Sequence, residues 1–198
     1  RYILSYSLVT GPAFIIFTIG NFIGSQKAAA VIAIAHYVGA LINGFFYRNH
    51  EEKKEKRKGG GRPPKGDYLE NFTDAIVSGF KAMAMILAYL MVFTIGINIL
   101  EHLGVFSVIN NQGVAASFKG IFEMTIGINL VGMCDMGIRL KSVIAAFLVS
   151  FGGLSVAGQS MSMARGSGIG LADILKIKLT HGMIAAIITT ILIHIVVI

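Results

Sequence analysis

The chain of 198 residues is 55% hydrophobic and 14% charged, with a mean hydropathy of +0.73 and a formal net charge of +7. Soluble domains carry about 25% charged residues, so this composition excludes an ordinary soluble domain and predicts an all-α polytopic membrane protein. The single Cys134 excludes a disulfide within the chain and argues against a thiolate metal site.

The apolar runs predict five or six membrane segments, because a spanning helix needs about 20 residues. In chain order they cover residues 8–23, 28–47, 82–100, 114–133, 140–156 and 180–198. Residues 72–81 are predicted to lie at the membrane interface. Residues 171–179 read as a separate amphipathic piece, either at the membrane surface or in a trimer contact of a homo-oligomer. Because the chain begins with Arg1 beside an apolar segment, we expect that an N-terminal part of the protein precedes it.

A basic loop at residues 48–70 divides the chain. Residues 48–65 contain eight of the 17 Lys and Arg residues and only three acids, with glycine and proline runs typical of linkers. The positive-inside rule places this loop in the cytosol and accounts for its charge without nucleic-acid binding. If every later segment crosses the bilayer, Arg139 and Lys141 lie on the same side as the loop.

Residues 139–163 predict a broken helix, because the apolar run is interrupted at Gly152-Gly153 and then continues with small polar side chains. A helix that breaks at bilayer depth must face protein or a water-filled cavity. Such breaks mark the substrate site in transporters, and free N–H groups at half-helix ends bind carboxylates. The predicted substrate-binding residues here are Ser155, Gln159, Ser160 and Ser162. The alternative is that these side chains only satisfy the broken backbone.

The first segment contains a second predicted break, at Gly11-Pro12. Proline frees a carbonyl group in a membrane helix, and nearby hydroxyls often bond to it. We predict that Thr10, which precedes this break, also contacts substrate. His36, inside the next segment, is interpreted as a hydrogen-bonded structural residue.

Glu123 lies near the middle of the predicted segment 114–133, where a carboxylate is costly and usually functional. We predict a role in binding substrate, an ion or a proton, with Thr125 and Asn129 beside it. The alternative is an ion pair with Lys119 or Arg139. The sequence contains no catalytic motif and no cluster of metal ligands, so we expect neither enzyme activity, nor a cofactor, nor a bound metal.

Several of these stretches resemble the YlbJ-type sporulation integral membrane proteins. The similar stretches are RYILSYSLVTGPAFIIFTIGNFIGS, IAIAHYVGALINGFFYR, GIFEMTIGINL and RLKSVIAAFLVSFGGLSVAGQSMSM. Together they cover nearly all of the chain apart from the basic loop. The sequence departs from the family at Ala157-Gly158-Gln159, where His-Ala-Gln is expected, so a polar side chain at position 157 is absent.

The resemblance implies membership of the nucleoside-recognition (Gate) superfamily, whose architecture is similar to concentrative nucleoside transporters with two inverted halves. It implies that residues 1–47 end a first half and that residues 71–198 form a second half with its break near 150–163. The implied function is transport of dipicolinate, a planar aromatic dianion, across the outer forespore membrane. Ser, Gln and backbone N–H donors suit such an anion, whereas Glu123 would hold a proton or cation.

Two alternatives stay open. A transporter of the same fold could carry nucleosides or another small metabolite, with Glu123 bonding to ribose hydroxyls. A membrane scaffold for spore assembly would transport nothing, although broken helices with polar linings favour transport. The sequence is compatible with coupling to a proton or a cation and equally with transport down a simple concentration gradient.

Overall fold

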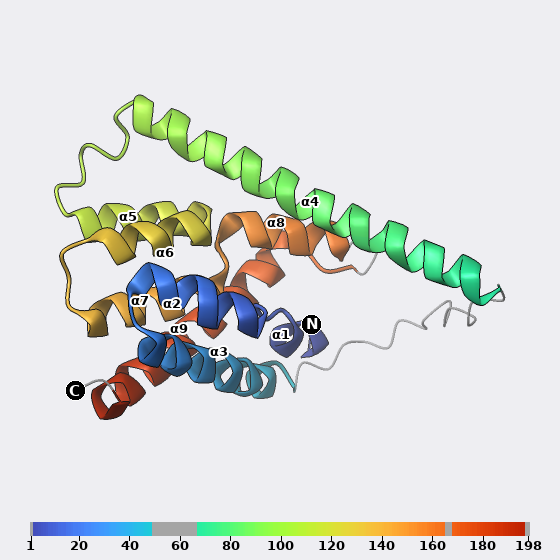
Figure 1. The fold of residues 1–198 in the computed structure, drawn as a ribbon, viewed down its shortest axis with the longest axis horizontal. Helices are drawn as coiled ribbons and strands as arrows, with labels where there is room; N and C mark the ends of the chain where they lie inside the picture. Colours follow the sequence, from blue (N-terminus) through green and yellow to red (C-terminus); the bar gives the residue numbers. More distant parts are fainter. Residues whose placement is uncertain (1, 49–66, 165–167, 197–198) are drawn as a thin grey trace.

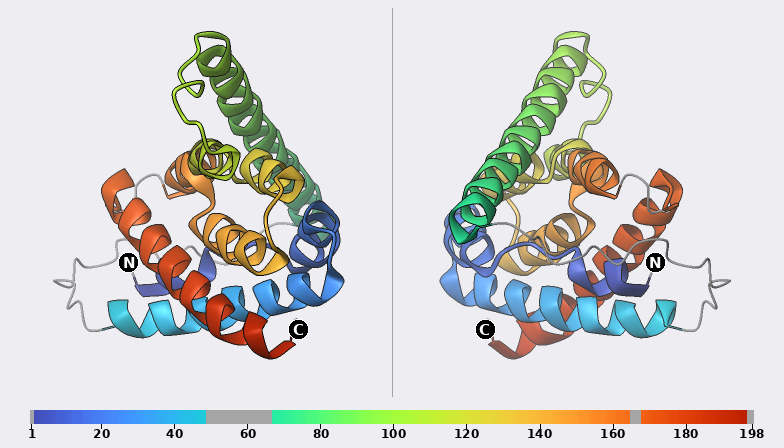
Figure 2. Two further views of the ribbon diagram at one scale, coloured as in Figure 1. Left: turned by 90° about the vertical axis from the view of Figure 1, so that its left-hand side faces the viewer. Right: turned by 90° about the vertical axis from the view of Figure 1, so that its right-hand side faces the viewer.

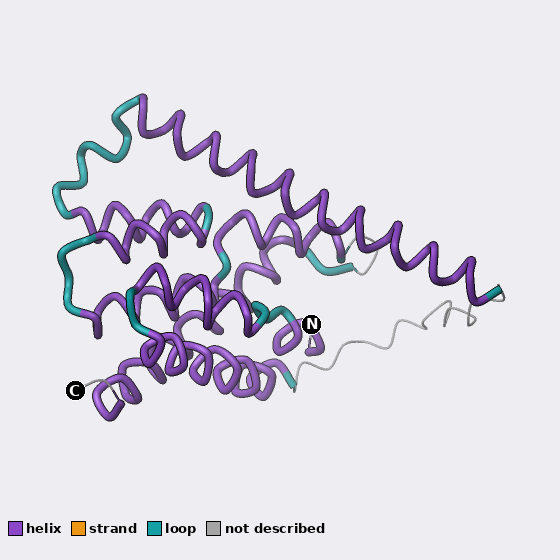
Figure 3. Tube along the Cα trace, in the orientation of Figure 1, coloured by secondary structure: helices purple, strands orange, loops and turns teal. Residues whose placement is uncertain are grey.

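The computed structural model describes residues 2–48, 67–164 and 168–196, and all regular elements in these ranges are helices (Figure 1, Figure 3). Four helical stretches are long and apolar enough to cross a membrane: Gln26–Tyr47, Tyr68–His102, Ile138–Met163 and Leu171–Val196. The predicted class, an all-α polytopic membrane protein, is therefore confirmed. Most of the predicted basic loop lies outside the described residues.

The first segment is a broken helix. Helix α1 (Tyr2–Ser7) is followed by irregular backbone and then by a π-helix, η1 (Phe14–Ile19), which continues as α2 (Gly20–Ile23). The predicted interruption at Gly11-Pro12 is thus observed. Helix α3 (Gln26–Tyr47) then runs back along this segment. It begins at Ser25, whose hydroxyl accepts a hydrogen bond from the Ala28 N–H at 3.2 Å and caps the helix.

Helix α4 (Tyr68–His102) is one uninterrupted helix of 35 residues, which contains both the stretch 72–81 predicted at the interface and the predicted span 82–100. It lies on the outside of the bundle, and most of its side chains are exposed (Figure 2). Its main contact is with α8 (Gly153–Met163). There the Tyr89 ring packs against Gly158, and the Tyr89 hydroxyl lies 2.7 Å from the Ser162 Oγ.

The predicted straight span at 114–133 is wrong, because these residues form a helical hairpin. Helix α5 (Gln112–Phe122) ends at Glu123, whose backbone is extended, and α6 (Met124–Met133) runs back alongside it (Figure 1). The two helices pack so closely that a methyl group at Gly127 would lie 2.1 Å from the Gly120 Cα. Each helix is about 15 Å long, half the hydrocarbon thickness of a bilayer, so neither helix of the hairpin is long enough to span it.

The hairpin changes the predicted topology. Both of its ends lie at the end of the bundle where α4 finishes, opposite the end where α3 finishes and α4 starts (Figure 1). Arg139 and Lys141, at the start of α7 (Ile138–Phe151), therefore lie at the opposite end from the end of α3 and the start of α4, which flank the basic loop, and not at the predicted same end. The error arose because an apolar run of about 20 residues fits one full span as well as two half-length helices.

The last helix, α9 (Leu171–Val196), is also continuous. Residues 171–179 were predicted as a separate amphipathic piece, but they form the first turns of this helix. Helix α9 packs mainly against α3 and α7, and these three helices enclose much of the core. The fully buried core side chains include Ile32, Leu148 and Ile193. This packing places the start of α9 beside both helix breaks.

Candidate functional site

The second break separates α7 from α8 at Gly152 and Gly153, as predicted. Their φ angles are 81° and 74°, in the left-handed region that favours glycine. The two residues face different neighbours. A methyl group at Gly153 would lie 3.1 Å from the Phe122 carbonyl oxygen at the hairpin tip, and one at Gly152 would lie 3.4 Å from the Lys178 Nζ. The break therefore connects the hairpin tip to α9.

Lys178 links the second break to the first. Its side chain comes from α9, is only 3% exposed, and donates a hydrogen bond from Nζ to the Leu8 carbonyl oxygen at 2.9 Å. Leu8 lies in the irregular backbone after α1, where no helical N–H reaches its carbonyl. Among the described residues no carboxylate forms an ion pair with Lys178. A buried cation without an acidic partner is costly, and such costs are usually tolerated at functional sites.

Thr10 lies in the first break, and every polar group of its backbone is held by α3. Its N–H donates to the His36 Nε2 at 2.9 Å, and its carbonyl oxygen accepts from the Tyr37 hydroxyl at 2.8 Å. The Thr10 hydroxyl lies 3.4 Å from the Val149 carbonyl oxygen on α7. His36 also lies 2.8 Å from the Ser150 Oγ, two residues before Gly152. One network therefore joins both breaks.

His181 and Asn43 extend this network between α3 and α9. The His181 Nε2 donates to the His36 carbonyl oxygen at 2.8 Å, and the rings of the two histidines lie 4.8 Å apart. Asn43, fully buried, donates from Nδ2 to the carbonyl oxygens of Ser5 and Ile177. The interpretation of His36 as a hydrogen-bonded histidine is confirmed.

Asn43→Ala is expected to destabilise the protein by about 2 kcal/mol, because it leaves buried carbonyl groups on α1 and α9 without this donor. Thermal unfolding of the purified protein in detergent measures the effect. Asn98→Ala is the matched control, since Asn98 is exposed on α4. Equal losses in the two variants would contradict a special role for the Asn43 side chain.

Glu123 occupies the tip of the hairpin and is 3% exposed. Its carboxylate accepts a hydrogen bond from the Ile126 N–H at 2.8 Å and caps α6. The predicted alternative of an ion pair with Lys119 is wrong, because Lys119 pairs with Glu101 at 2.6 Å. Thr125 lies in the first turn of α6, beside the tip, whereas Asn129 lies one turn further along.

The four predicted residues after the second break divide into two groups. Ser155 lies in the first turn of α8, is 1% exposed, and its hydroxyl has no hydrogen-bond partner in the described part of the chain. Gln159, Ser160 and Ser162 lie about one to two turns further along α8, and Ser162 bonds to Tyr89 on α4. Of the four, Ser155 therefore lies nearest to the second break.

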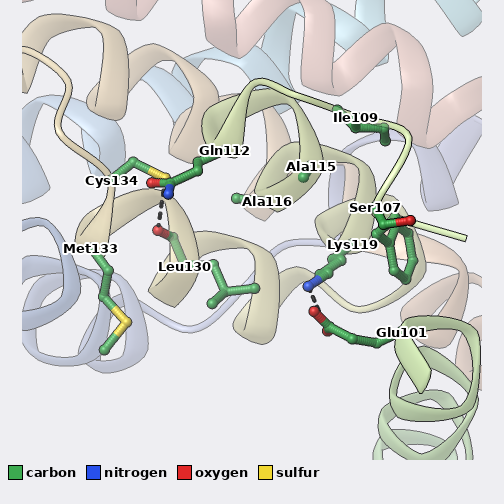
Figure 4. Close-up of a pocket in the computed structure, with 11 residues that line it drawn as sticks. Glu101, Ser107, Ile109, Gln112, Ala115, Ala116, Lys119, Leu130, Met133 and Cys134 are labelled. Carbon is green, nitrogen blue, oxygen red and sulfur yellow. Dashed lines mark hydrogen bonds and ion pairs between the residues drawn. The ribbon is translucent and has the colours of Figure 1, made fainter. Parts of the chain in front are cut away.

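A separate pocket of about 370 Å³ lies at the other end of the hairpin (Figure 4). The end of α4, residues 106–109 and the two hairpin helices line it. Glu101 and Lys119 meet at its edge, and the Lys119 ammonium lies 5.0 Å from the centre of the Phe106 ring. None of the residues in the network around Lys178 lines this pocket.

The described residues contain no group of three or more His, Cys, Asp or Glu side chains that could hold a metal ion. Sequence reasoning missed Lys178 and His181 as members of the site. A helical pattern could have found them, since Ile174, Ile177, Lys178 and His181 follow the i, i+3, i+4, i+7 spacing of one helix face, and all four are buried.

The fold and site define a polytopic membrane protein in which two broken helices and the tip of a hairpin meet around a buried lysine. The chain is similar to the sporulation integral membrane protein YlbJ of Bacillus subtilis (strain 168), with 24% identity over 127 residues. The similar region covers 58% of this chain and 31% of YlbJ, so the chain spans well under half of that relative's length. No protein-family model and no solved structure matches the chain.

Proposed function

We propose that the protein carries a small anionic metabolite across a membrane and binds it where the two helix breaks meet. The observation that carries this proposal is the placement of Lys178, a buried cation between the breaks with no acidic partner among the described residues. Its ammonium has three N–H donors, and the bond to Leu8 uses one of them. A carboxylate at this position would compensate the charge.

The start of α8 supplies a second feature suited to an anion. No side chain caps this helix, so its first N–H groups and the positive end of its dipole face the break. The unpartnered Ser155 hydroxyl lies in the same turn and offers a further donor. Lys178 beside Gly152 and Ser155 after Gly153 would thus approach a bound anion from two sides.

We infer that the anion is dipicolinate and that transport takes place across the outer forespore membrane during sporulation. The similarity to a sporulation integral membrane protein supports a membrane role in that process. Dipicolinate carries two carboxylates on one aromatic ring, which suits two separate donor groups such as Lys178 and the start of α8. A nucleoside, which is uncharged, would leave the Lys178 charge uncompensated.

Thermal unfolding of the purified protein with dipicolinate, and with uridine as comparator, tests the proposal. A ligand at about 100 times its Kd stabilises the native state by about 2.7 kcal/mol, so dipicolinate is expected to raise the unfolding temperature. Ser155→Ala should reduce this shift, whereas Ser107→Ala, in the exposed loop after α4, should not.

Gln159→Ala serves as a further variant, since Gln159 lies farther from the break than Ser155 and a smaller effect is expected. A rise in the unfolding temperature with uridine alone would indicate that the substrate is a nucleoside and not an anion. Absence of any shift, together with absence of dipicolinate flux into proteoliposomes, would reject transport of this anion and favour a scaffold.

A further inference from the structure

The hydrogen bonds of His36 define its protonation state. The Thr10 N–H can only donate, so the His36 Nε2 that it contacts at 2.9 Å must carry a lone pair. The imidazole is therefore neutral, with its hydrogen on Nδ1, where it donates to the Ser150 Oγ at 2.8 Å. In this state the His36 ring bonds both to the backbone of the first break, at Thr10, and to the end of α7 just before the second break, at Ser150.

A proton on the His36 Nε2 would abolish this arrangement. Two N–H groups, those of Thr10 and of the imidazolium, would then point at each other, so the hydrogen bond would be lost and the backbone at Thr10 repelled. His181 differs, because its Nε2 already donates to the His36 carbonyl oxygen. Protonation of His181 would break no such bond.

We propose that His36 is a proton-binding site whose protonation releases Thr10 from α3 and so loosens the first helix break. The titratable or polar groups that face His36 are Lys178 and His181 from α9, Tyr37 from α3 and Ser150 from α7. None of these is a carboxylate. The release of Thr10 by a proton follows from the donor and acceptor pattern and does not depend on transport.

Coupling between the proton and the anion, by contrast, rests on the proposed function. Lys178 interacts electrostatically with the His36 ring, and its positive charge opposes a second one there. An anion bound to Lys178 would cancel that opposition, so anion and proton would each favour the binding of the other. Transport would then be coupled to protons moving in the same direction.

NMR spectroscopy of the labelled protein in detergent tests the proton site without any ligand. As the pH is lowered from about 8 to about 3, a range extended downward because burial disfavours the imidazolium, the Thr10 amide resonance is expected to move together with the His36 ring nitrogens. His36→Gln should abolish this movement, because glutamine can accept the Thr10 hydrogen bond but takes up no proton. His194→Gln, on the exposed end of α9, should leave it unchanged.

A Thr10 resonance that stays constant over this range, or that moves equally in His36→Gln, would overturn the proposal. Added dipicolinate is expected to shift the midpoint of the titration to higher pH, and an unchanged midpoint despite binding would reject the coupling alone. If dipicolinate fails to bind, the proposed function fails, and the ligand-free titration still decides whether His36 is a proton site.

Discussion

Lys178→Met is expected to abolish dipicolinate uptake into proteoliposomes and to weaken binding at least 30-fold, or about 2 kcal/mol. Removing one member of a desolvated charge pair typically costs that much or more. In the free protein the same substitution removes a buried cation that has no acidic partner among the described residues. Stability without ligand should therefore be unchanged or slightly higher.

The opposite signs of these two effects separate a ligand-binding role from a purely structural one. Lys178→Arg keeps the charge but changes the shape of the donor group, and it should retain part of the binding. Lys176→Met is the matched control, since Lys176 lies two residues away on α9 and is exposed. If Lys178→Met unfolds the protein while Lys176→Met does not, the lysine serves the fold through its bond to Leu8.

Gly127→Ala is expected to produce the largest loss of stability, about 3 kcal/mol. The added methyl group would lie 2.1 Å from the Gly120 Cα and 2.6 Å from the Gly120 nitrogen, and backbone atoms cannot move aside as a flexible side chain can. The two hairpin helices must then separate. Because the hairpin tip contacts Gly153, ligand binding should weaken as well.

Thermal unfolding in detergent, with and without dipicolinate, measures both effects. Gly96→Ala provides a control of opposite sign, because a methyl group there meets no atom within 4 Å. Alanine in a helix interior is more favourable than glycine by about 0.5–1 kcal/mol, so Gly96→Ala should stabilise α4. Similar unfolding temperatures for the two variants would argue against the close approach of α5 and α6.

Local features of the sequence predicted the class of fold and both breaks. Composition defines a membrane protein, Gly11-Pro12 interrupts the first segment, and Gly152-Gly153 interrupts the fifth. These features could be predicted because each depends on the backbone preferences of neighbouring residues. The positions of Thr10 and Ser155 beside the breaks were predicted in the same way, since each lies within a few residues of a break.

The hairpin and the hydrogen bond of Lys178 could not be predicted from local features, although the helical pattern of α9 indicates that Lys178 lies on a buried face. A turn at Glu123 needs no proline, and the close contact that holds the hairpin depends on two glycines seven residues apart. Lys178 appeared to belong to the polar face of a short amphipathic piece. Its partner, Leu8, is 170 residues away in the chain, so the hydrogen bond between them leaves no signal in the local sequence. No pattern within α9 indicates which carbonyl its ammonium will reach.

That separation of 170 residues also has a consequence for the order of folding. At a synthesis rate of about 5–20 residues per second, the first broken helix emerges about 10–30 s before the lysine that completes its hydrogen bonding. During this interval the carbonyl group of Leu8 lacks its partner on α9 and must bond to water or lipid head groups. The hydrogen bonding of the first segment is therefore complete only when the last helix has been inserted.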